Sequence, residues 1–376
     1  MSNISPPQPT KKESSGCLKW LALPFAILLV IVLPLALLAF DVGRVVFNRP
    51  LVKSIVTDEV VNSDLIPAAL EWFSDRRAQQ RVASGEALTG IREPDIVLLM
   101  SYLDAKDWRA IKEEVLPDEI LTEWTSITVD GTYDWIDSDD RVPQISWSLR
   151  SFKDRVNTQH GVNAIVIAYD NIAPCTQEEI EDFKTRLDAA PPGTDVLYNL
   201  CEFPDPWHED QFSDYVNSLH EVVANIVDEF YLTEELSRIA DTAGVGPEVL
   251  KAQLRLIRLL MLYAWVAPFA LLMILLLLVV RSLRTLSRWC GLPLLVGGFV
   301  TLLPPLVYRY LITSLLATGP LSEAPELITQ EATRAILRLA AHIFQPMLIQ
   351  AIVVTGVGLL LVIWMTVTKK RAAEQS

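Results

Sequence analysis

The chain has 376 residues, of which 51% are hydrophobic, and its mean hydropathy of +0.30 exceeds that of an ordinary soluble protein. Its net charge is −14, but 41 of the 46 acidic residues lie between Asp41 and Arg258, against 20 of the 32 Lys and Arg. This segment would repel nucleic-acid phosphates, so we exclude nucleic acid as a partner and expect part of the chain to lie in a lipid bilayer.

Four uncharged apolar runs are long enough to cross a membrane as helices. About 20 apolar residues span the roughly 30 Å of hydrocarbon, because a helix satisfies its own backbone hydrogen bonds where water cannot. The runs are Trp20–Phe40, Leu259–Val280, Trp289–Tyr308 and Ile343–Thr368. The sequence therefore predicts a multi-pass membrane protein with four transmembrane helices.

The first apolar run has two interpretations. Lys11, Lys12 and Lys19 precede it, as in a cleaved signal peptide. The run is longer than the ~7 to 15 residues of a signal-peptide core, however, and no clear small-x-small cleavage site follows it. We therefore expect an uncleaved signal anchor and retain the cleaved signal peptide as the alternative.

The direction of the spans is predicted from short basic segments, which stay in the cytoplasm. With four crossings, three such segments fall on one side: the residues before the first span, the loop of Arg281, Arg284 and Arg288, and the tail from Lys369 to Arg371. Both termini are then cytoplasmic and the acidic segment is extracytoplasmic. The expected order is a tail over 1–19, a span over 20–40, the acidic domain over 41–256, a span over 257–280, a cytoplasmic loop over 281–288, a span over 289–313, an outer loop with an amphipathic helix over 314–342, a span over 343–368 and a tail over 369–376.

Breaks within the later spans are also expected from the sequence. Gly297, Gly298 and the Pro304–Pro305 pair predict a kink in the third span, since proline removes a backbone donor. Pro346 predicts a bend between the amphipathic helix and the fourth span. In contrast, the pattern from Pro247 has no breaker, which predicts one helix from the acidic domain into the second span.

The acidic domain has mostly helical punctuation, and we assign the whole chain to the all-α class. Thr176 and Glu179, for example, fit a capping box, and Asp205 with Pro206 opens a helix that we extend to Phe230. Two stretches carry strand signals. Ser126–Val129 is expected to be a strand, whereas Val162–Ala168 fits a strand or a buried helix equally well.

One acidic cluster was considered as a metal site. Closely spaced carboxylates bind calcium through oxygen, but this cluster lacks the glycine and distal glutamate of an EF-hand loop, so a solvated turn at a helix end is the preferred interpretation. The cluster consists of Asp134, Asp137, Asp139 and Asp140. We find no catalytic motif and predict no cofactor.

Six tryptophans occur in the acidic domain. Aromatic side chains can line a groove for sugars or peptides, but in a helical domain they are usually core anchors, which is the interpretation that we prefer. They are Trp72, Trp108, Trp124, Trp135, Trp147 and Trp207.

The four cysteines separate into two groups under the predicted topology. Cys175 and Cys201 lie in the outer domain, whereas Cys17 and Cys290 fall at the reducing cytoplasmic side. We therefore predict a disulfide between Cys175 and Cys201. Two buried free thiols are the alternative.

Two resemblances accompany these patterns. The stretch with Trp135, then Pro174-Cys175-Thr176, then Cys201-Glu202-Phe203-Pro204 resembles segments of uncharacterised bacterial multi-pass membrane proteins. It covers about a fifth of the chain and implies no activity. The topology is similar to permease subunits of the mechanotransmission type of ATP-binding-cassette systems, although the outer domain here is more helical and the loop from Arg281 to Arg288 is short for a coupling element.

Three functions remain open from the sequence. The preferred hypothesis is a non-enzymatic membrane protein whose outer domain binds a partner or supports an envelope assembly. A permease-like subunit of a transport system is the second hypothesis. An extracytoplasmic enzyme is the third.

Overall fold

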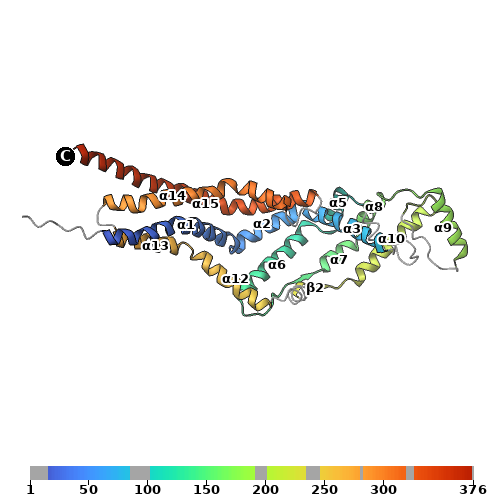
Figure 1. Ribbon diagram of the computed structural model, residues 1–376. Coiled ribbons are helices and arrows are strands. Elements are labelled where there is room, and N and C mark those ends of the chain that lie inside the picture. The colour runs from blue at the N-terminus through green and yellow to red at the C-terminus, as the bar shows by residue number, and fades with distance from the viewer. Residues whose placement is uncertain are drawn as a thin grey trace, which may run out of the picture. The chain divides into compact units, whose positions relative to one another are not determined.

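The computed structural model describes residues 16–84, 102–190, 201–233, 246–279, 283–318 and 326–374. Within these residues the chain forms thirteen helices and only two strands, of three residues each, which confirms the all-α class. The chain divides into two compact units, which are described separately below (Figure 1).

The first unit contains the membrane helices. It comprises Met1–Asn48, Leu254–Ile312 and Leu337–Ser376. Three helices are long and apolar enough to cross a membrane on their own, and a fourth crossing exists if a bent helix pair counts as one span. The single helices are α1 (Gly16–Val46), α14 (Leu283–Thr318) and α15 (Glu326–Glu374), and the bent pair is α12 (Pro247–Leu262) with α13 (Val266–Val279).

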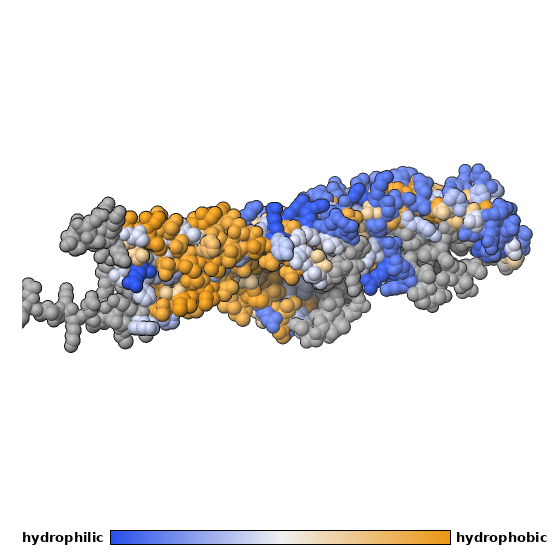
Figure 2. Space-filling model, turned by 45° about the horizontal axis from the view of Figure 1, so that its top comes forward, coloured by the Kyte–Doolittle hydropathy of each residue, from blue (hydrophilic) through white to orange (hydrophobic). Residues whose placement is uncertain are grey.

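The outer surface of these helices is hydrophobic. Leu277 is 81% exposed, and Leu306 and Leu360 are each more than two-thirds exposed. In water such exposure of large apolar side chains would be unfavourable, whereas lipid tails solvate them without cost. The visible surface of this unit is mostly hydrophobic, and that of the second unit is mostly hydrophilic (Figure 2).

The membrane helices pack through small side chains. Ala22, Ala26 and Leu29 of α1 are buried against Leu271 and Leu275 of α13. Glycines serve the same purpose between α14 and α15: a β-carbon at Gly298 would stand 2.6 Å from Thr355 Oγ1. A kink was expected around Gly297, Gly298 and Pro304–Pro305. None of these residues interrupts α14, which runs as one helix from Leu283 to Thr318. Gly298 permits close helix packing there.

One other expectation about these helices was wrong. The second span is not one helix from Pro247, because α12 and α13 are separated by a turn at residues 263–265 and bent by 41°. Pro268 explains the break: inside a continuous helix its ring would clash with the carbonyl of Ala264, whereas it is tolerated in the first turn of α13. At Pro346, where the sequence predicts a bend between the amphipathic helix and the fourth span, α15 is continuous and forms a single helix of 49 residues.

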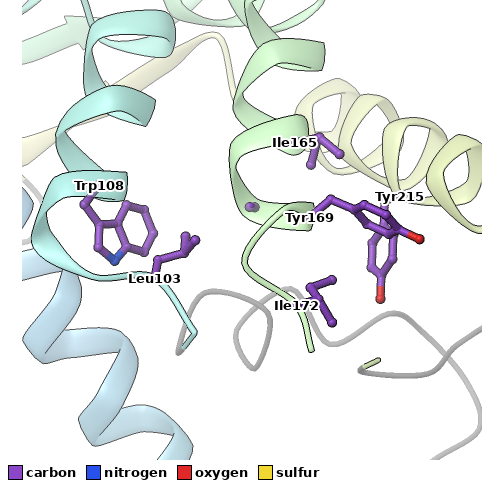
Figure 3. Close-up of a cluster of buried hydrophobic side chains, with 7 residues drawn as sticks. Leu103, Trp108, Ile165, Tyr169, Ile172 and Tyr215 are labelled. Atoms are coloured by element: carbon purple, nitrogen blue, oxygen red, sulfur yellow. The ribbon is translucent and has the colours of Figure 1, made fainter. Parts of the chain in front are cut away.

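The second unit comprises Arg49–Gln253 and Thr313–Ile336. Its core lies where α5, α8 and α10 meet, with Trp108, Ile165, Tyr169 and Tyr215 buried together (Figure 3). Its helices are α2 (Arg49–Asn62), α3 (Leu65–Ser84), α5 (Ala105–Val115), α6 (Asp118–Asp137), α7 (Arg150–Val156), α8 (Gln159–Tyr169), α9 (Gln177–Ala189) and α10 (His208–Asn225).

The two strands lie outside Ser126–Val129, the stretch for which the sequence predicted a strand. β1 (Ser146–Ser148) and β2 (Glu229–Tyr231) are antiparallel. The expected strand at Ser126–Val129 is wrong, since these residues lie within α6. Its β-branched residues fit the helix because Val129 and Thr125 turn towards the interior, and burial decides over local propensity. Val162–Ala168 is helical, within α8.

Local capping is confirmed at one predicted position. Thr176 Oγ1 accepts from the Glu179 backbone, and the Glu179 carboxylate accepts from the Thr176 backbone, which forms the capping box of α9. The helix expected from Asp205 to Phe230 is shorter, because α10 ends at Asn225 before β2. The sequence also predicts a short helix from Glu93 to Leu103 and a helix end at Gly244 and Gly246, and both fall largely outside the described residues.

The tryptophans are partly core residues. Trp108 and Trp135 are buried, as expected of anchors. Trp72, Trp124, Trp147 and Trp207 are half-buried. Trp124 and Trp147 stack in parallel with ring centroids 5.4 Å apart, and both indole nitrogens donate hydrogen bonds within the domain, to Ser148 O and Thr128 Oγ1. These contacts make the pair a structural element.

Candidate functional site

The disulfide between Cys175 and Cys201 is present, which confirms the predicted pair. The two chain segments also share backbone hydrogen bonds: Cys175 N donates to Glu202 O, and Glu202 N donates to Ala173 O. The cross-link therefore joins the start of α9 to the segment that precedes α10. Among the described residues Cys290 is a free thiol, and it is buried between the membrane helices.

An aromatic cluster lies beside the disulfide and fixes α9. Phe183 of α9 and Phe203 are both almost completely buried, with ring centroids 4.4 Å apart. Trp207 packs edge-on against Phe183, and Lys184 lies over the Trp207 ring. A short helix with this anchor and a covalent link at its start has little freedom to move.

Gln211 of α10 connects this region to the domain core. Its side chain is 1% exposed, and its hydrogen bonds include three to Tyr169, Phe203 and Cys201. Its Oε1 accepts from Tyr169 Oη at 2.7 Å and from Phe203 N at 3.0 Å, and its Nε2 donates to Cys201 O at 2.9 Å. Burial raises the pKa of Tyr169 well above its ordinary value and that of Tyr215 to about 12, so both phenols stay neutral at physiological pH. This network is structural, and no sequence pattern around Gln211 predicts it.

The outer side of α9 presents an acidic stripe. Glu178, Glu181 and Asp188 are exposed and recur at helical spacing on the side away from Phe183. We call these three residues the α9 acidic stripe. Asp182, on a neighbouring position, pairs with Arg186. The stripe is therefore a negatively charged surface held in place by the disulfide and the aromatic cluster.

The acidic cluster that was considered for calcium has another role. Asp134 pairs with Arg49 of α2 at 2.7 Å, beside Asp130, which pairs with both Arg49 and Lys53. Asp140 accepts a hydrogen bond from Ser138 after the end of α6. Within the described ranges no three His, Cys, Asp or Glu side chains are placed to hold a metal ion. Asp137 and Asp139 lie at the same helix end. Within the described residues they form no metal-binding group with Asp134 and Asp140.

The ion pairs lower the pKa of the Asp130 carboxyl. The hydrogen bond from Lys53 is the largest cause, followed by that from Arg49. Both cations favour the charged form of the carboxylate. As the pH falls, Asp130 therefore stays ionised to a lower pH in the folded chain than in the unfolded chain. The cluster thus ties α2 to α6.

A second connection reaches α6 from α12. Lys251 is buried, and its Nζ donates to the Asp140 carbonyl at 2.7 Å and lies over the Trp135 ring. A cation at the carboxyl end of α6 also complements the partial negative charge of the helix dipole. The two segments that link this domain to the membrane helices in sequence are therefore both fastened to α6.

Comparison with known proteins gives no relative from which a function could be transferred. No family model matches the chain, and neither curated proteins nor solved structures show a significant match.

Proposed function

We propose that this chain is a multi-pass protein of the cell membrane whose outer domain binds a protein partner in the cell envelope. In this proposal both termini are cytoplasmic, which follows from the short basic segments at residues 11–19, 281–288 and 369–371. The domain between the first two spans is then extracytoplasmic. A disulfide in that domain is consistent with an oxidising compartment.

The α9 acidic stripe is the observation that carries the proposal. Exposed carboxylates on a mobile loop are ordinarily a solvated surface, whereas those of α9 are held by a disulfide, a capping box and a buried aromatic cluster. A prepositioned charged surface loses little conformational entropy on binding. The partner that fits it is a basic surface of another protein, which the stripe attracts electrostatically.

Co-purification tests this function. The full-length protein is extracted in mild detergent at low ionic strength after cross-linking in cells, and the recovered proteins are identified by mass spectrometry. We expect an envelope protein with a basic surface to accompany the wild-type chain. The test variant is Glu181→Lys with Asp188→Lys, because these positions reverse charge without touching the capping box or the Asp182–Arg186 pair.

A matched control has the same change in charge elsewhere in the domain. Glu123→Lys with Asp154→Lys alters two exposed carboxylates on α6 and α7. Loss of the partner in the α9 variant and retention in the control supports the proposal. Equal recovery with both variants would show that the stripe does not bind the partner.

A permease-like subunit of a transport system is the second candidate function. The observation that favours it is a pair between two membrane helices, in which the buried carboxylate of Asp41 accepts a hydrogen bond from the half-buried Gln350. Ionisable residues inside a membrane span usually mark ion or substrate pathways. Recovery of a cytoplasmic ATPase in the same co-purification would favour this candidate over the first.

A further inference from the structure

Asp41 is a buried carboxylate within a membrane-spanning helix. It is 1% exposed and lies in α1, in the candidate span Ala22–Val46. Its position is five residues, about 8 Å, from the end of that span on the side of the large domain. Asp41 thus lies near one end of the span, yet its side chain is shielded from water, so an unpaired charge there would be costly.

The partner of Asp41 is Gln350 of α15. Gln350 Nε2 donates to Asp41 Oδ1 at 3.0 Å. The second oxygen of each group is buried and has no hydrogen-bond partner: Asp41 Oδ2 and Gln350 Oε1. Both atoms are acceptors when the acid is ionised, so neither can satisfy the other. Buried polar atoms without partners are rare and require an explanation.

In the described part of the chain, no positively charged side chain forms a direct ion pair with Asp41. On α1 the nearest cation is Arg44, which is exposed. The described part of α13 has no ionisable side chain. On α12, Arg258 lies over the Phe47 ring. The titratable groups in the second half of α14 are Tyr308, Arg309 and Tyr310, and the titratable group of α15 nearest in sequence to Gln350 is His342, eight residues away.

We propose that Asp41 and Gln350 form a proton-binding site in which Asp41 is the neutral acid. A proton on Oδ2 converts this atom from an acceptor into a donor, and Gln350 Oε1 is the acceptor that lacks one. The amide and the acid then exchange two hydrogen bonds, one in each direction, and both orphaned atoms are satisfied. A hard metal cation would need about six oxygen ligands, and this pair has three side-chain oxygens, one of which already accepts a hydrogen bond, so the proton fits better.

Infrared spectroscopy of the full-length protein in lipid nanodiscs tests the site. At neutral pH in sodium-free buffer we expect a carbonyl-stretch band of a protonated carboxylic acid, which shifts in D₂O. The band disappears in Asp41→Asn, which keeps the shape of the neutral acid and both directions of hydrogen bonding. Asp134→Asn, which changes a carboxylate in the outer domain, leaves the band unchanged. Absence of the band in the wild-type protein overturns the proposal.

A second variant and a titration keep the test decisive if Asp41→Asn does not fold. Gln350→Leu removes the partner, so a retained band should move to higher frequency as the acid loses its hydrogen bonds. An unmoved band would mean that the protonated acid is elsewhere. Addition of sodium at constant pH should leave the wild-type band unchanged, and its loss on sodium binding would overturn the assignment of the proton as ligand.

Discussion

Gly358 of α15 lies directly against the backbone of Leu295 of α14. A β-carbon at position 358 would overlap the Leu295 amide nitrogen and α-carbon, which are backbone atoms that cannot move independently of the helix. Two residues earlier on the same helix, a β-carbon at Gly356 would meet no atom within 4 Å. The two glycines therefore differ in packing and share nearly the same sequence surroundings.

This difference predicts opposite effects of one methyl group. Gly358→Ala forces α14 and α15 apart and should lower the free energy of unfolding by about 1 to 3 kcal/mol. Gly356→Ala should leave it unchanged or raise it slightly, because alanine is the better helix former. Thermal unfolding of the two purified variants in the same detergent measures the difference. Equal stabilities would contradict the close contact.

Gln211 should be essential to the stability of the outer domain. Gln211→Leu leaves Tyr169 Oη, Phe203 N and Cys201 O without their partner, at about 1 to 3 kcal/mol for each buried group, so we expect a loss of about 3 kcal/mol or more. Hydrogen exchange of the Phe203 amide in the full-length protein reports this loss. Tyr169→Phe removes one bond and should cost about 1 kcal/mol. A larger loss of stability in Tyr169→Phe than in Gln211→Leu would contradict this prediction.

The disulfide should contribute to stability through the unfolded chain. Replacing Cys175 and Cys201 by serine releases a loop with a sequence separation of 26, for which the chain-entropy model gives about 3 kcal/mol. Denaturant unfolding of the full chain, followed by proteolysis within α9, measures the loss. Alkylation of the unfolded, unreduced wild-type protein provides the check, and labels on both Cys175 and Cys201 would show that no bond exists.

The ion pairs of Asp130 should make part of the stability pH-dependent. The pKa of this carboxyl is lower in the folded chain than in the unfolded one, so its contribution is present above the unfolded value of about 4 and is lost as the pH falls through the folded value. Asp130→Asn should therefore cost about 1 kcal/mol at pH 7, since the pairs are partly exposed, and the cost should vanish in acid. Asp154→Asn, on the exposed side of α7, should change little. A cost that persists at pH 2 would assign the effect to another cause.

The proposed orientation predicts where tags are accessible. A tag before Met1 and another after Ser376 should both resist external protease in intact cells, because the basic segments that flank the spans stay in the cytoplasm. A protease site introduced beside exposed Glu123 of the outer domain should be cleaved in the same cells once the outer barrier is permeabilised. Digestion of either terminal tag would exclude four crossings with both ends inside.

The sequence predicted those features that depend on local chemistry or on long-range composition. The apolar runs, the Thr176 capping box and the Cys175–Cys201 pair follow from residue types alone. The break at residues 263–265 depends on a proline three positions into the next helix, which the unbroken apolar pattern concealed. The Gln211 network and the Asp41–Gln350 pair join positions far apart in the sequence, so no local pattern could reveal them.

The attachment of both connecting segments to α6 has a consequence for how this protein is built. Arg49, at the start of the second unit, binds Asp130 and Asp134, and Lys251, near the end of its first segment, binds the carbonyl of Asp140. These contacts fall within the eleven residues from Asp130 to Asp140, of which α6 contains the first eight. The domain thus begins and ends at nearly the same place, as inserted domains do. We therefore expect that a short linker between positions 49 and 251 could replace the residues between them and leave the membrane helices in their original order.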